Sequence, residues 1–134
     1  LQQRFYIPKE DWLVTVFYEC DRLDAPYILQ ELDDVGVDEY TYIRAAESLR
    51  AGRKDTGMTY SNTLERTSVI VISKSSTKAE FANTWVHELN HCSKHIAIAD
   101  GLDCNSEAPA YIAGELARSM QPVAARLMCP TCGK

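Results

Sequence analysis

The sequence predicts an α+β fold, in which a small mixed β-sheet packs on one long helix that a second helix follows. Two runs of β-branched and aromatic residues, 12–18 and 67–73, are typical of buried strands. A capping motif that begins at Thr77 precedes a long stretch with helical periodicity. The chain has 134 residues, which is enough for one domain with a hydrophobic core. We place that domain at 1–128 and leave 129–134 as a cysteine-containing tail.

Charge and composition narrow the class of protein. The net charge is −5, so the chain lacks the excess of lysine and arginine that a nucleic-acid or anionic membrane surface requires. No apolar run reaches the length of a membrane span, and no secretory signal is visible. A signal peptide removed earlier remains compatible with leucine at the first position. The odd number of cysteines predicts reduced thiols in a cytoplasmic protein: Cys20, Cys92, Cys104, Cys129 and Cys132.

The first half of the chain predicts one central strand followed by two helices. We expect residues 1–11 to be a polar lead-in, and residues 12–18 to be a strand buried on both faces because polar alternation is nearly absent. Asp24 and Asp38 can each cap a helix, and a glycine follows each helix at its expected end.

The second half predicts a β-hairpin and two long helices. Strands at 58–61 and 67–73 are separated by a short polar segment, which favours a hairpin. The long helix that Thr77 caps can run to a glycine at position 101. A second helix begins near Ser106, and we expect Pro122 to kink or end it.

The long helix carries the pattern His87-Glu88-Leu89-Asn90-His91, which reads H-E-x-x-H. Two residues four apart on a helix project from one face, about 40° apart, so both imidazoles can bind one zinc ion. Glu88 can then reach a water molecule on the metal. His87 and His91 fall opposite an apolar stripe, so a cleft or a second helix is expected on their side. A solvated polar helix face is the plain alternative.

A catalytic zinc site takes three protein ligands and keeps one position open. His95 lies about 12 Å along the helix from His87, so one metal ion cannot bind both on a straight helix. Glu107 and Glu115 on the returning helix are the other candidates. A crossing helix pair would bring Glu107 to the histidines and a straight pair would bring Glu115, so geometry leaves both open.

The segment 107–114, Glu-Ala-Pro-Ala-Tyr-Ile-Ala-Gly, resembles the E-x-x-A-Y-x-x-G segment of small gluzincin-type HExxH proteins encoded in bacterial prophages and other mobile elements. The stretch 56–62 together with Arg66 is also similar to that family. The resemblance implies a zincin-like fold, a zinc metallopeptidase and Glu107 as the third zinc ligand. The tail with Cys129 and Cys132 looks like half of a zinc knuckle and lies outside the resemblance; we expect a free tail there.

The expected activity is hydrolysis of peptide bonds in a peptide or protein substrate that the sequence does not identify. Two imidazoles and one carboxylate leave a zinc site with positive charge, which lowers the pKa of water. Glu88 is expected to accept the proton and pass it to the leaving amine. Tyr111 lies one turn beyond Glu107 and is a candidate donor to the oxyanion. The alternative is a zinc-binding, non-catalytic zincin-like interaction module.

Overall fold

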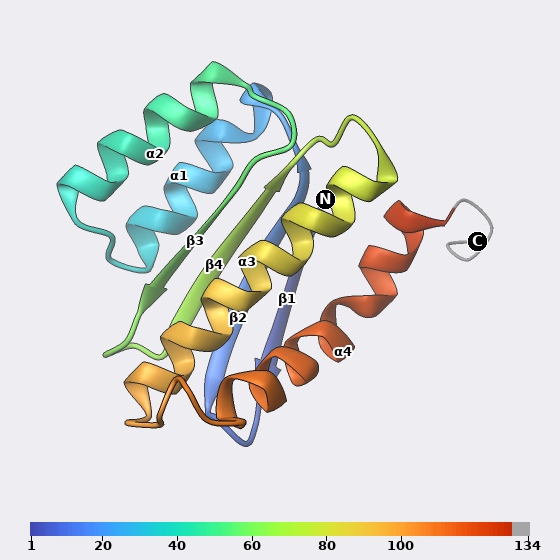
Figure 1. Ribbon diagram of the computed structural model, residues 1–134. Helices are drawn as coiled ribbons and strands as arrows, with labels where there is room; N and C mark the ends of the chain where they lie inside the picture. The colour runs from blue at the N-terminus through green and yellow to red at the C-terminus, as the bar shows by residue number, and fades with distance from the viewer. Residues whose placement is uncertain (130–134) are drawn as a thin grey trace.

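The structure, a computed structural model, describes residues 1–129 and has a mixed α+β fold (Figure 1). Its strands form a four-stranded sheet: β1 (Gln2–Ile7), β2 (Trp12–Cys20), β3 (Gly57–Asn62) and β4 (Thr67–Ser73). A short 3-10 turn, η1, precedes the first α-helix. The helices are α1 (Ala25–Asp34), α2 (Glu39–Ala51), α3 (Lys78–Ala99) and α4 (Ala108–Met128), and η1 spans Arg22–Asp24.

The strands lie in the order β1-β2-β4-β3, so β1 and β3 are the edges of the sheet. β2 and β4 are parallel, while both edge strands run antiparallel to their neighbours. The parallel pair needs a crossover connection, which α1 and α2 supply on one face of the sheet. α3 and α4 cover the other face, with α3 over β3 and β4, and α4 toward β1 (Figure 1). The expectation of a mixed α+β fold is confirmed.

β2 is buried on both faces, as its sequence predicts. Alternate residues from Trp12 to Tyr18 join the core under α3 and α4, whereas Phe17 and Cys20 join the core under α1 and α2.

Asp24 occupies the N-cap position of α1 but makes no capping hydrogen bond with its side chain. The caps at Asp38 and Thr77 are confirmed, because their side chains accept from the Thr41 N–H at 3.4 Å and the Glu80 N–H at 3.1 Å. The Thr77 cap fixes where α3 begins, and therefore which residues of α3 face the sheet.

One expectation about the chain ends was wrong, and one of the two alternatives for Pro122 is excluded. Residues 2–7 form β1 instead of a polar lead-in, because Phe5 and Ile7 alternate with polar residues and reach the core. Pro122 does not end the second long helix, since α4 continues to Met128. The burial of Met120 and Ala124 against α3 and the sheet stabilises the turns on both sides of the proline.

Three of the described cysteines are reduced, and the described helices show no membrane span. Cys20, Cys92 and Cys104 are free thiols, and burial raises the pKa of Cys20 and of Cys92 to about 12. Cys132 and the rest of the predicted tail beyond Cys129 lie outside the described residues. Within residues 1–129, no helix is both long and apolar enough to cross a membrane.

Candidate metal and catalytic site

The HExxH residues lie midway along α3, on the flank of the helix that faces β3. The carboxylate of Glu88 and the ring of His95 both contact β3 side chains. α4 lies along the opposite flank of α3 (Figure 1). The histidine side chains therefore project toward the β3 edge of the sheet and away from α4.

His87 and His91 form a close pair. Their Nε2 atoms lie 3.1 Å apart, and their rings meet edge-on with centroids 4.7 Å apart. A tetrahedral metal ion with nitrogen ligands at 2.0–2.1 Å holds such atoms about 3.3 Å apart. The His87 side chain is 64 % exposed, so the space beyond the pair is open to solvent. Donor chemistry and spacing both fit a zinc ion bound by the two Nε2 atoms.

Glu88 is the buried member of the motif, with only 4 % of the residue exposed. Its Oε1 accepts a hydrogen bond from Thr59 Oγ1 at 2.9 Å, and its Oε2 lies 3.9 Å from His87 Nε2. Gly57 makes room for the carboxylate, since a Cβ there would lie 2.7 Å from Glu88 Cγ. The edge strand thus aims one carboxylate oxygen toward the histidine pair.

A cavity of about 320 Å³ opens beside the motif. It lies between the start of β3 and α3 and is lined by Asp55, Gly57, Asn83, Thr84, His87 and Glu88, among others. The Asp55 carboxylate accepts from Ser76 N and Ser76 Oγ, both at 2.7 Å, and these hydrogen bonds lower its pKa. These hydrogen bonds therefore favour the carboxylate form of Asp55 at the cavity wall.

His95 takes part in a chain of hydrogen bonds that leads into the sheet. Its Nδ1 lies 2.7 Å from Ser61 Oγ, which lies 2.7 Å from Ser68 Oγ. The indole N–H of Trp12 donates to Ser68 Oγ at 2.8 Å. Burial and, to a smaller degree, the neighbouring His91 lower the pKa of His95. His95 is thus held by a β3 side chain through its Nδ1 atom, and the expectation that it is not a metal ligand stays a prediction.

Within residues 1–129, Glu107 does not join the histidine pair in a group that could hold a metal ion. Glu107 is the N-cap residue of α4, and Tyr111 is 69 % exposed one turn later. Glu115 forms an ion pair with Arg118 at 3.3 Å. Among residues 1–129, no three histidine, cysteine or acidic side chains gather closely enough to hold a metal ion. Glu107 as third ligand stays a prediction from the resemblance.

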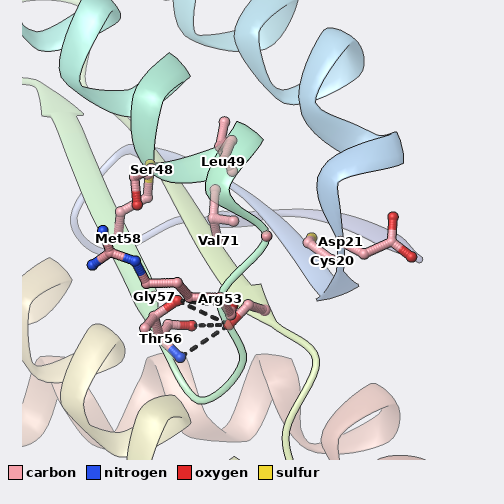
Figure 2. A pocket seen from close by; sticks show the side chains of 11 residues that line it. Cys20, Asp21, Ser48, Leu49, Arg53, Thr56, Gly57, Met58 and Val71 are labelled. Atoms are coloured by element: carbon pink, nitrogen blue, oxygen red, sulfur yellow. Dashed lines mark hydrogen bonds between the residues drawn. The ribbon is translucent and has the colours of Figure 1, made fainter.

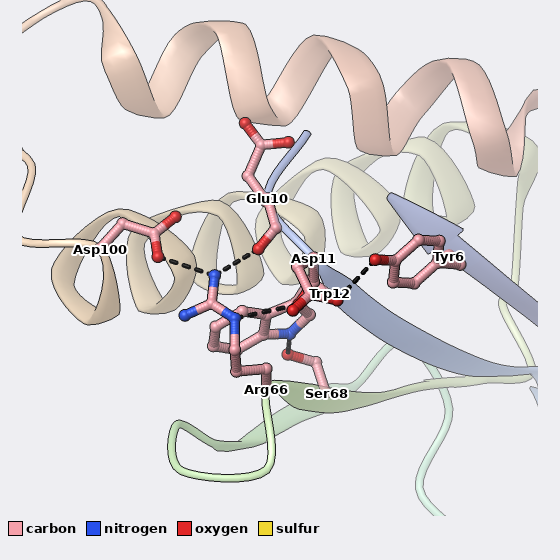
Figure 3. A network of polar contacts seen from close by, with 7 residues as sticks. All are labelled: Tyr6, Glu10, Asp11, Trp12, Arg66, Ser68 and Asp100. Carbon is pink, nitrogen blue, oxygen red and sulfur yellow. Dashed lines mark hydrogen bonds and ion pairs between the residues drawn. The ribbon is translucent and has the colours of Figure 1, made fainter. Parts of the chain in front are cut away.

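Two polar networks hold the elements that carry the site. Arg66 donates to the carbonyls of Glu10 and Asp11 and to Asp100 Oδ1, the last at 2.8 Å, and lies over the Trp12 ring (Figure 3). This network ties the end of α3 to the β3–β4 hairpin and to the β1–β2 turn. One charged donor and three acceptors thus hold the C-terminal end of α3 in place.

The second network holds the beginning of β3. The Thr56 N–H donates to Ser73 Oγ at 2.9 Å, and Ser73 Oγ donates to the Thr56 carbonyl at 2.6 Å. These bonds lie beside a small pocket between α2 and the ends of β2 and β4 (Figure 2). The start of β3, including Gly57, is thereby held against the end of β4.

The contribution of β3 to the site was missed from the sequence. Three alternate residues of β3 lie on its face toward α3 and contact Glu88 or His95: Gly57, Thr59 and Ser61. The signal was present as three small residues at a spacing of two, which share one face of a strand. The stretch was predicted as a strand and noted for its resemblance, but nothing in the sequence says which helix covers that face.

No family model matches the sequence, and comparisons with curated proteins and with solved structures also found no match.

Proposed function

We propose that the protein is a zinc-dependent metallopeptidase with a zincin-like site at the β3 edge of the sheet. The observation that carries the proposal is the pair of Nε2 atoms 3.1 Å apart beside a buried glutamate. In this proposal His87 and His91 hold the metal. A bound zinc ion supplies a Lewis acid, which polarises a carbonyl group and lowers the pKa of water. Hydrolysis of a peptide bond is the reaction that these groups fit best.

Glu88 is the proposed general base and acid. Thr59 holds one carboxylate oxygen, so the other is free to accept a proton on the histidine side and to pass it to the leaving amine. Glu107 is the proposed third ligand and Tyr111 the proposed donor to the oxyanion, as the resemblance implies. Both assignments require the first turn of α4 to approach the histidine pair.

A second candidate is a zinc-binding, non-catalytic interaction module of a phage or mobile element. Two observations favour it: Glu88 is almost fully buried, and residues 1–129 gather no third ligand. Under either candidate we propose a cytoplasmic protein, since three free thiols suit a reducing compartment.

Metal content and turnover test the proposal together. We expect purified protein to carry one zinc per chain, measured by mass spectrometry of the metal, and the His91→Ala variant to lose most of it. Glu88→Gln should keep the zinc and lose hydrolysis of a peptide mixture, followed by mass spectrometry. Zinc that remains in His91→Ala would refute the site, while unchanged products with Glu88→Gln would refute its catalytic role.

The third ligand has a matched test on α4. Glu107→Gln should weaken zinc binding about 10- to 100-fold if its carboxylate is a ligand, and Glu115→Gln should leave it unchanged. Equal zinc affinity in the two variants would remove Glu107 from the site.

A further inference from the structure

β3 presents a free backbone edge with a different environment on each face. Within residues 1–129 it pairs only with β4, so no strand of this part of the chain pairs with the main-chain groups on its other side. Thr59 and Ser61 point to the α3 side, where they contact Glu88 and His95. Tyr60 points to the other side, where its hydroxyl donates to the Gly36 carbonyl at 3.2 Å. A strand added at this edge would alternate its side chains between the same two environments.

The environment on the α2 side is a groove of about 360 Å³ between α2 and β3. Its floor and walls are mainly apolar and include Leu32, Tyr40, Ala45, Met58 and Tyr60. Tyr40 is 67 % exposed at the rim, where a bound side chain could cover its ring. Such an opening suits one bulky apolar side chain.

Arg44 adds a positive charge at the rim of the groove. Its guanidinium lies 5.7 Å from the centre of the Tyr40 ring and donates to the Tyr40 hydroxyl at 3.0 Å. None of the ion pairs among residues 1–129 involves Arg44. The Glu47 carboxylate on the same helix interacts with Arg44 electrostatically without forming an ion pair, so the guanidinium on the aromatic ring is still a partner for a further carboxylate.

The cavity at His87 and the α2 groove lie on the two faces of the same edge strand. We propose that the α2 groove is a substrate subsite, and that it selects an extended peptide bearing a bulky apolar residue with an acidic residue two positions away. Residues two apart share one face of a strand, so both side chains would meet the groove, while their neighbours face the histidine pair. This inference rests on the proposed peptidase function.

An extended peptide fits better than a second copy of this chain. Two copies joined through β3 would bring two Arg44 side chains and the same apolar surface together, with like charges at the rim. A peptide with a carboxylate provides the opposite charge and satisfies the free edge through its own main chain.

The test uses zinc-loaded protein that carries Glu88→Gln, so that bound peptides are not consumed. The probes are fluorescein-labelled heptapeptide pools with phenylalanine or serine at the centre and glutamate, lysine or serine two positions away. Fluorescence anisotropy of the labelled peptides at rising protein concentration measures dissociation constants up to about 1 mM, a range that includes weak complexes. Matched variants are Tyr40→Ala and Arg44→Glu in the groove, and Tyr27→Ala on α1, whose side chain is 72 % exposed outside the groove.

We expect the phenylalanine–glutamate pool to bind best and Tyr40→Ala to weaken that binding at least about fivefold. Arg44→Glu should shift the preference from glutamate to lysine, which loss of structure would not do, and Tyr27→Ala should leave binding unchanged. No binding by any pool, equal effects of Tyr27→Ala and Tyr40→Ala, or a concentration-dependent dimer in sedimentation would overturn the proposal.

Hydrolysis of the same pools by zinc-loaded wild-type protein separates this proposal from the proposed function. Peptides that bind in the groove without cleavage would support the subsite and refute the peptidase. Cleavage that is indifferent to Tyr40 and Arg44 would support the peptidase and refute the subsite.

Discussion

Gly57 allows β3 to approach Glu88 on α3 closely, so Gly57→Ala tests how the site is supported. A Cβ at this position would lie 2.7 Å from Glu88 Cγ and 2.8 Å from the Val71 carbonyl oxygen. The glutamate side chain can turn aside, but the Val71 carbonyl belongs to the backbone of β4. Overpacking of this kind costs about 1–3 kcal/mol, so we expect the free energy of unfolding to fall by that amount.

Gly114 is the matched control because it lies within α4 and a Cβ there meets nothing within 4 Å. Gly114→Ala should stabilise the protein by about 1 kcal/mol through helix propensity alone. The two substitutions are chemically identical, so their opposite signs isolate the effect of the close contact. The expected difference between the two variants is about 2–4 kcal/mol.

Urea unfolding of zinc-free protein, followed by circular dichroism, measures both values. The Glu88→Ala background removes the Cγ atom, so Gly57→Ala should cost about 1 kcal/mol less there and keep only the conflict with Val71. A neutral or stabilising Gly57→Ala would refute the close packing of β3 against Glu88. An equal cost in both backgrounds would assign the effect to the β4 backbone alone.

Three further predictions concern the support of the site. Arg66→Ala should lower the free energy of unfolding by about 2–3 kcal/mol, because a charged donor to three acceptors is lost, and Arg66→Lys should restore little of it in urea unfolding. The pKa of His95 in the folded protein lies below its ordinary 6.5, so the unfolded protein binds more protons near that pH. The free energy of unfolding should therefore fall as the pH drops through 6.5. His95→Gln should flatten this dependence in zinc-free protein between about pH 5 and 8. Thr59→Val should lower kcat about fivefold by removing the hydrogen bond to Glu88, whereas Thr59→Ser should keep it, in peptide-hydrolysis assays.

Each of these expectations has a clear opposing result. A loss below about 0.5 kcal/mol in Arg66→Ala would mean that the network does not hold α3, since surface substitutions give such values. Parallel pH curves for wild type and His95→Gln would contradict the burial argument. Equal kcat values for Thr59→Val and Thr59→Ser would show that the Thr59 hydroxyl does not position Glu88.

The elements that local chemistry determines were predictable from the sequence. The strand at 12–18, the hairpin and the cap at Thr77 follow from side-chain branching, turn residues and capping groups, all within a few residues. β1 was missed because its apolar residues are few, and its stability comes from pairing with β2. The sequence left open whether Pro122 kinks or ends its helix, and the helix continues because packing around the proline offsets the hydrogen bond that it lacks.

In the candidate site, too, features that depend on local sequence were predictable, and features that depend on the packing of other elements were not. The spacing of His87 and His91 on one helix face is a local property, and the structure gives their Nε2 atoms a separation that suits one metal ion. The burial of Glu88 and the position of Glu107 depend on which elements flank α3. Helical periodicity identifies an apolar stripe but does not say that β3 lies on one side of it and α4 on the other. The contacts of Gly57 and Thr59 with Glu88 could therefore not be predicted from the sequence.

The hydrogen-bonded chain from Trp12 to His95 has a consequence for the position of a proton. An indole N–H can only donate, so Ser68 always uses one lone pair to accept from Trp12. When Nδ1 of His95 carries no proton, the Ser61 hydroxyl must turn to donate to it; when Nδ1 is protonated, that hydroxyl is released toward Ser68. Exchange between the two tautomers of His95 is thus coupled to the rotation of a hydroxyl group on the edge strand. Nδ1 faces Ser61 in both states, so the exchange changes only which ring nitrogen of His95 carries the proton.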